Sequence, residues 1–163
     1  VRGLRGAIGR MVPVAPSSIE YAKPLIVIIP VLICVLTIIM ALTLYTRLPE
    51  RIAVHFDIRG NPDRWSARTS FLTSGLVPAI ILCAISVAVF SFIRKTTQKP
   101  ALPYMIVALF ALTQVFIAYA QFDTYWVNMN GVHIIAFPLN MIIYISVTAL
   151  CLFLYFRKVK MTV

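Results

Sequence analysis

Four long apolar segments alternate with shorter polar segments along the chain. They cover residues 24–45, 71–93, 102–122 and 134–156, and none of them contains Asp, Glu, Lys or Arg. A bilayer core of about 30 Å needs roughly 20 apolar residues in a helix, because each residue adds about 1.5 Å. Continuous apolar runs of this length also lack the alternation of a barrel strand. The pattern therefore predicts an all-α membrane protein with four transmembrane helices in one domain, residues 24–156.

The amino-acid composition is also typical of an integral membrane protein. Of the 163 residues, 61% are hydrophobic and 12% are charged, and the mean hydropathy is +0.92. Soluble domains are about a quarter charged and just under half apolar. These values exclude a water-soluble globule, a disordered tail and a disulfide-rich secreted scaffold. The lipid bilayer is the expected surrounding of the chain.

The net charge of +10 is unevenly distributed between the polar segments. Ten lysines and arginines lie in residues 1–23, 94–101 and 157–163, against five in the loop of residues 46–70. The positive-inside rule then places both termini in the cytoplasm and the loop 46–70 outside a cell membrane. The charge is thus a topology signal. We expect no nucleic-acid partner, because the chain lacks the basic and aromatic pattern of such modules.

The loop of residues 46–70 predicts a short β-like structure. Four apolar residues in it alternate with polar or small ones, namely Ile52, Val54, Phe56 and Ile58. This period of two predicts a strand over residues 51–59 with one apolar face, followed by a turn at 59–62. A lone strand leaves its backbone groups unpaired. Its partner could come from a second subunit or from the third loop, where Asn130 and Gly131 are typical of a hairpin turn.

Nine positions of this loop form one pattern, namely Leu48, Pro49, Ile52, His55, Phe56, Asp57, Gly60, Pro62 and Asp63. The pattern resembles the signature of the domain of unknown function 1648, over about residues 46–93. That family of small multi-span membrane proteins includes the immunity protein against the sporulation-delaying toxin. The resemblance implies an outer loop after the first span and brings no catalytic residues with it. Ala53 stands where the family commonly has proline, and Asp57 where asparagine is frequent. We take the nine residues as the candidate partner-binding loop.

One possible role for the polar side chains of the loops is to bind a metal ion. His55, Asp57 and His133 are the weak candidates, and Asp63 and Asp123 lie on the same side of the membrane. Histidine and carboxylate suit zinc or copper. The simpler alternative is that His55 hydrogen-bonds within the loop and fixes the turn after it. We expect no metal, no cofactor and no enzymatic activity, because no nucleophile, paired acid or cofactor motif accompanies the histidine.

Small and amide side chains within the spans are the candidates for helix packing. Gly75 and Ala79 lie four residues apart in the second span, a spacing that lets another backbone approach closely. Gln114 and Asn140 lie at depths that differ by about 3 Å when counted from the outer ends of their spans. We therefore expect these two side chains to hydrogen-bond, directly or through water.

Three functions remain open from the sequence. The first is a non-enzymatic accessory subunit that docks on a larger membrane assembly through its outer loop. The second is an immunity or sensor protein that recognises an extracellular peptide through the same loop, as in the family member named above. The third is a small transporter component, although no ionisable residue within the spans marks a proton or ion pathway.

Overall fold

The computed structural model describes residues 23–97 and 101–160. Its elements in chain order are the 3₁₀ turn η1 (Pro24–Val27), α1 (Ile28–Tyr45), β1 (Arg51–Phe56), β2 (Pro62–Ala67), α2 (Thr69–Thr96), α3 (Ala101–Asn130) and α4 (Phe137–Lys160). The predicted fold class is confirmed, because four helices are long and apolar enough to cross a membrane. Residues 1–22 of the basic N-terminal segment and residues 161–163 of the tail lie outside the described part of the chain.

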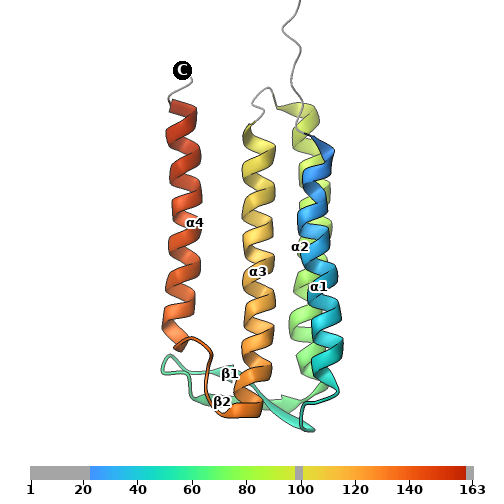
Figure 1. Cartoon of the computed structure of the whole chain (residues 1–163), viewed down its shortest axis with the longest axis vertical. Coiled ribbons are helices and arrows are strands. Elements are labelled where there is room, and N and C mark those ends of the chain that lie inside the picture. The colour runs from blue at the N-terminus through green and yellow to red at the C-terminus, as the bar shows by residue number, and fades with distance from the viewer. Residues whose placement is uncertain (1–22, 98–100, 161–163) are drawn as a thin grey trace, which may run out of the picture.

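The four helices run side by side, and the two strands lie across one end of them (Figure 1). The start of α1, the end of α2, the start of α3 and the end of α4 lie at the opposite end. Helices α1, α2 and α3 pack against one another, whereas among the described helices α4 packs against α3 alone. The chain is therefore a multi-pass membrane protein built as a three-helix bundle with a fourth helix attached to α3.

The interior of the three-helix bundle holds small and polar side chains as well as apolar ones. Gly75 and Ala79 are both buried in α2. A Cβ atom added to Gly75 would overlap the side-chain amide of Gln121, whose Nε2 donates to the Phe71 carbonyl at 2.6 Å. Lipid tails are as apolar as leucine, so helices associate through close backbone approach and through hydrogen bonds. Gly75 provides the space and Gln121 provides the bond between α2 and α3.

Gln114 lies at the contact of α1, α2 and α3 and is 1% exposed. In the orientation that satisfies its amide, the nitrogen donates to the Pro30 carbonyl at 2.7 Å and the oxygen accepts from the Cys83 N–H at 3.2 Å. The expected bond with Asn140 is therefore wrong. Counting residues gave the two side chains similar depths, but it did not show that Gln114 faces α1 and α2 while Asn140 lies on α4.

The strands β1 and β2 form an antiparallel hairpin within the first loop. Arg51 pairs with Ala67, and Ile52 pairs with Ser66, before the register shifts around His55. The partner of the predicted strand is therefore β2, its own neighbour in sequence, and the alternative that the third loop supplies the partner is wrong. β1 also ends at Phe56 and not at residue 59, which leaves Ile58 79% exposed in the turn. Pro62 fits as the first residue of β2, because a proline there gives up no ladder bond.

The third helix is longer than predicted and the third loop is correspondingly shorter. α3 continues eight residues beyond Phe122 to Asn130, and α4 begins at Phe137 instead of residue 134. Gly131 has a φ of +77° and its N–H donates to the Val127 carbonyl at 2.8 Å. Asn130 and Gly131 are therefore a helix end and not a hairpin turn, since a glycine after the last helical residue also favours positive φ.

The base of the hairpin packs on the helices through one apolar cluster. It consists of Ala41, Leu48, Ile52 and Phe71, each at most 3% exposed. The Arg68 N–H also donates to the Glu50 carbonyl at 2.9 Å and closes the open end of the hairpin. The hairpin is thus fixed to α1 and α2 at the end where the chain enters and leaves it.

Candidate functional site

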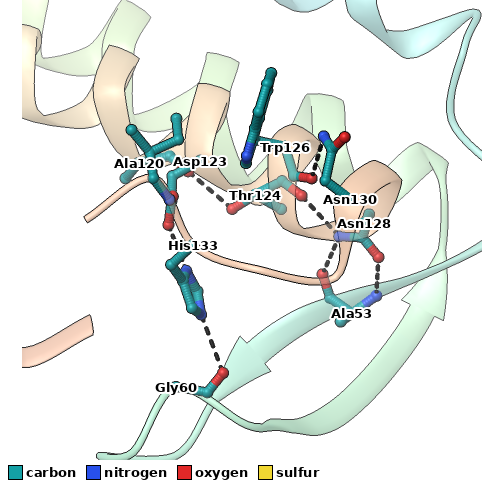
Figure 2. A network of polar contacts seen from close by, with 10 residues as sticks. Ala53, Gly60, Ala120, Asp123, Thr124, Trp126, Asn128, Asn130 and His133 are labelled. Carbon is teal, nitrogen blue, oxygen red and sulfur yellow. Dashed lines mark hydrogen bonds and ion pairs between the residues drawn. The ribbon is translucent and has the colours of Figure 1, made fainter. Parts of the chain in front are cut away.

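The middle of the hairpin is attached to α3 by the side chain of Asn128. The Ala53 N–H donates to Asn128 Oδ1 at 2.7 Å, and Asn128 Nδ2 donates to the Ala53 carbonyl at 2.9 Å (Figure 2). A side-chain amide carries one acceptor and one donor group side by side. Asn128 therefore pairs with β1 as a neighbouring strand would, and it satisfies the backbone of a residue that is 3% exposed.

The turn of the hairpin is attached to the α3–α4 link through His133. Its Nδ1 lies 2.6 Å from Asp123 Oδ2, and its Nε2 lies 3.0 Å from the Gly60 carbonyl oxygen (Figure 2). The second oxygen of Asp123 accepts from the Ile134 N–H at 2.8 Å. Asp123 therefore holds the α3–α4 link and the histidine together, and the histidine reaches the hairpin.

Both ring nitrogens of His133 face acceptor oxygens, one of a carboxylate and one of a carbonyl. A neutral imidazole donates from one nitrogen only, whereas an imidazolium donates from both. The ring therefore bonds the oxygen that faces its protonated nitrogen, and it bonds both oxygens when both nitrogens carry protons. Since the side chains of His133 and Asp123 are only 10% and 7% exposed, solvent screens their interaction weakly.

Close packing around His133 explains the glycine of the turn. Gly60 has a φ of +84°, and a Cβ atom there would lie 3.1 Å from His133 Cδ2. Phe56 packs its ring on His133 in an edge-to-face arrangement, with the centroids 4.7 Å apart, and Phe137 lies 6.4 Å from Phe56. Gly60 supplies both the left-handed backbone and the room for the imidazole. Phe56 thus packs on the histidine that attaches the hairpin turn to the α3–α4 link.

Asp57 shapes the turn from within. Its Oδ1 accepts from the N–H groups of Arg59 and Asn61, both at 2.8 Å. These bonds stabilise the ionised carboxylate, so the hydrogen bond from the Asn61 backbone, with smaller contributions from Arg59, lowers the pKa of Asp57 below its ordinary value. Such side-chain capping of a turn is typical of aspartate. The pattern residue Asp57 has a structural task in the hairpin.

A second histidine–aspartate pair lies on the solvent-exposed face of the hairpin. His55 Nδ1 lies 2.5 Å from Asp63 Oδ1, and the two side chains are 59% and 44% exposed. The pair joins β1 to β2 across the sheet. The alternative that His55 hydrogen-bonds within its own loop thus agrees with this contact, although the partner is on β2 and not in the turn.

The candidate metal ligands do not gather at one place. His55 pairs with Asp63, Asp57 accepts from the turn backbone, and His133 pairs with Asp123. Among residues 23–97 and 101–160, no group of three or more His, Cys, Asp or Glu side chains could hold a metal ion. These side chains instead make hydrogen bonds within the hairpin, or between the hairpin, α3 and the α3–α4 link.

The remaining pattern residues lie at the ends of the hairpin. Leu48 is buried beside Ile52 in the core cluster, whereas Pro49 is exposed ahead of β1. Asn128 is the one attachment residue that the sequence did not point to, because an asparagine in the middle of the predicted loop of residues 123–133 carries no motif of its own. Asp123 and His133 are both among the candidate metal ligands. They are the only acid and the only histidine after residue 100, which is the one sequence feature that connects them.

Comparison with protein families gives one match. Residues 32–82 match the family described as Domain of unknown function (DUF1648), and this segment covers most of α1, the hairpin and the first half of α2. The resemblance expected from the loop pattern is confirmed for this segment. Comparison with curated proteins and with solved structures gives no match.

Proposed function

We propose that this integral membrane protein is a non-enzymatic partner-binding protein, which docks through its hairpin on a larger membrane assembly as an accessory subunit. The proposal rests on the difference between the two strands of the hairpin. β1 is fastened to the helices through Ala53 and Ile52, whereas β2 is exposed at every position except the half-buried Ser66.

The free edge of β2 favours a protein as the partner. β2 pairs with β1 on one side and with no other strand among the described residues. An exposed strand edge offers unpaired N–H and C=O groups that an extended segment of another chain can pair with. Because the hairpin is already held at its base, middle and turn, binding orders little additional chain and so loses little entropy.

The side chains of the exposed surface support the same proposal. Trp65 is 54% exposed, Arg64 is exposed beside it, and both residue types are frequent at the energetic centres of interfaces. The loop of residues 46–70 carries five arginines against three acidic residues. A partner surface with an excess of carboxylates would therefore complement it.

The distribution of basic residues supports an outward-facing hairpin. Lys23 directly precedes η1, Arg94 and Lys95 lie in the last turn of α2, and Arg157 lies near the end of α4. These are the ends of the helices that lie opposite the hairpin (Figure 1). By the positive-inside rule, that end faces the cytoplasm of a cell membrane and the hairpin faces outward. A partner then meets the hairpin outside the membrane.

A second candidate function uses the same edge. An immunity or sensor protein would recognise an extracellular peptide, and a free strand edge accepts an extended peptide directly. The two candidate functions differ in their binding partner. An accessory subunit binds a large membrane complex, whereas an immunity or sensor protein binds a soluble peptide.

The experiment is purification of the full chain from its native membrane in mild detergent, followed by mass spectrometry of the intact particle. We expect a stoichiometric complex with at least one further membrane protein. Trp65→Ala and Arg64→Glu should release it, since they alter the exposed strand and no buried contact. Trp126→Ala is the matched control, because Trp126 is also partly exposed, at 38%, but lies on α3.

A monomeric or self-dimeric particle would contradict the accessory-subunit proposal. Retention of a secreted peptide by that particle, lost in the Trp65→Ala variant, would establish the peptide-recognition alternative. Flux through liposomes that contain the chain alone would favour the third hypothesis, a transporter component.

A further inference from the structure

The hairpin is attached to the helices at its base, its middle and its turn, and only the attachment of the turn is made by an imidazole. The base packs through the apolar cluster that includes Ile52 and Phe71, and the middle is bonded by the amide of Asn128. An amide and apolar side chains carry no charge at any pH near neutrality. The turn is bonded by His133, and an imidazole ordinarily changes charge at about pH 6.5.

The two acceptors that face His133 differ in how they respond to its protonation. Asp123 Oδ2 lies 2.6 Å from Nδ1, and a carboxylate beside this nitrogen keeps a proton on it. A ring with one proton therefore carries it on Nδ1. The lone pair of Nε2 then faces the carbonyl oxygen of Gly60 at 3.0 Å, where two acceptors repel each other. The contact with Gly60 is thus a hydrogen bond only when Nε2 also carries a proton.

The surroundings of His133 leave the hairpin turn as the part that can move. The ring lies between Phe56, in an edge-to-face contact with the centroids 4.7 Å apart, and Phe137, with the centroids 5.7 Å apart. Asp123 is itself fixed, because its Oδ1 accepts from the Ile134 N–H at 2.8 Å. In the turn, by contrast, Ile58 is 79% exposed. Repulsion at Nε2 is therefore relieved by displacement of the turn and not of the ring.

The charged and titratable groups nearest the ring come from α3 and from the hairpin turn. α3 contributes Asp123 and, one turn before it, Tyr119. The turn contributes Asp57, whose Oδ1 bonds the turn backbone, and the exposed Arg59, whereas α4 contributes the aromatic ring of Phe137. Carboxylates, tyrosine and arginine ordinarily titrate at about pH 4, about pH 10 and above about pH 12. Between about pH 5 and pH 9, the imidazole is thus the group of this region that is expected to change charge.

The second histidine of the chain lies on the other face of the hairpin. His55 precedes Phe56 in β1, and successive side chains of a strand point to opposite faces. Phe56 packs on His133, whereas His55 pairs with Asp63 on the solvent-exposed face. Titration of His55 therefore acts on a different set of contacts.

We propose that His133 forms a pH-sensitive contact, which attaches the hairpin turn to the α3–α4 link when both ring nitrogens are protonated and releases the turn when only Nδ1 is. The bond to Asp123 is present in both states. The bond to Gly60 is present at acidic pH and is lost as the pH rises through the titration of the ring. The proposal concerns the turn itself, and it holds whether or not the hairpin docks on a partner.

The test uses the full chain in phosphatidylcholine nanodiscs at about pH 5.5 and about pH 8.5, on either side of the ordinary titration of an imidazole. The chain contains two histidines, so His55→Gln leaves the ring of His133 as the only one labelled with ¹⁵N-histidine. NMR of the ring nitrogens should show both protonated at the lower pH and Nδ1 alone at the higher pH. This measurement reads the two states of the contact directly.

Hydrogen exchange of the turn amides measures the release. The N–H groups of Gly60 and Asn61 both bond Asp57, one to its carbonyl oxygen and one to its Oδ1. After correction for intrinsic rates, their exchange should be about tenfold faster at the higher pH, the factor of one hydrogen bond from a charged donor. The Arg68 N–H bonds the Glu50 carbonyl at the base of the hairpin, so its corrected exchange should stay unchanged.

Two matched substitutions assign the pH response to one histidine. His133→Gln retains a side-chain donor but does not titrate, so the corrected exchange of Gly60 and Asn61 should be equal at the two pH values. His55→Gln makes the same change on the exposed face and should retain the tenfold response. Because the ring of His133 is intact in the His55→Gln chain, that variant decides the test should His133→Gln fail to fold.

Three outcomes would overturn the proposal. They are an unchanged protonation of the His133 ring between the two pH values, equal or slower corrected exchange of the turn amides at the higher pH, and the same pH response in the His133→Gln variant.

Discussion

The hairpin end of the molecule holds two histidine–aspartate pairs that differ in their surroundings. His133 and Asp123 lie 2.6 Å apart with side chains that are 10% and 7% exposed. His55 and Asp63 lie 2.5 Å apart with side chains that are 59% and 44% exposed. The first pair connects the hairpin turn to α3 and α4, and the second lies on the open face of the hairpin.

Burial, and not pairing, decides what each histidine does. Removing one partner of a buried ion pair leaves an unpaired charge without water, which is strongly destabilising. Removing one partner of an exposed pair leaves a charge that water solvates, at little cost. His133 therefore belongs to the support of the hairpin, whereas His55 is available to a binding partner.

The largest expected effect is that of His133→Ala. The substitution leaves the carboxylate of Asp123 buried without its partner and frees the Gly60 carbonyl, so it should cost about 3 kcal/mol. Thermal unfolding in mild detergent measures the loss, and hydrogen exchange of residues 51–67 locates it. Asp123→Asn combined with His133→Ala should recover part of the stability, because no unpaired charge remains. A loss of stability no larger than that of His55→Ala would contradict the different roles of the two histidine–aspartate pairs.

Asn128→Leu should have the next largest effect. It removes both bonds to Ala53 and leaves a buried N–H and C=O unpaired, at a cost of about 2 kcal/mol. Asn130→Leu is the matched control, since Asn130 is exposed and its side chain donates to the Trp126 carbonyl of its own helix, at 3.0 Å. Equal hydrogen exchange of the hairpin in the two variants would contradict the role of Asn128 as an attachment residue.

His55→Ala should change stability by less than about 1 kcal/mol, because its pair with Asp63 is exposed. The proposed function predicts a different result for association, namely weaker retention of the partner complex in mild detergent. Unfolding of the hairpin in this variant would show that exposure is a poor guide to the cost of losing the pair.

The smallest effect is the pH dependence that Asp57 confers on the turn. Because its pKa is lowered in the folded chain, the carboxylate contributes stability above its ordinary pKa near 3.8 and loses that contribution as the pH falls through the lowered value. Amide exchange of Arg59 and Asn61 should therefore accelerate as the pH drops below about 4, after correction for intrinsic rates. Asp57→Asn should remove this dependence, and an unchanged profile would contradict the assignment.

The amino-acid sequence by itself determined the number of spans, the end of the first helix and the place of the β-like loop. Each of these depends on local properties. A run of apolar residues must span lipid as a helix whatever surrounds it, and the alternation around Ile52 and Phe56 needs only the period of a strand.

The tertiary structure alone decided which groups meet. Gln114 faces α1 and α2, Asn128 pairs with Ala53, and Asp123 reaches His133, because the rotation of α3 sets the direction of every one of its side chains. In lipid, an amide or a carboxylate bonds with whichever partner the packed helices bring within reach. The hydrogen-bond partner depends on residues far apart in the chain, so it cannot be predicted from residue spacing or from depth along a single helix.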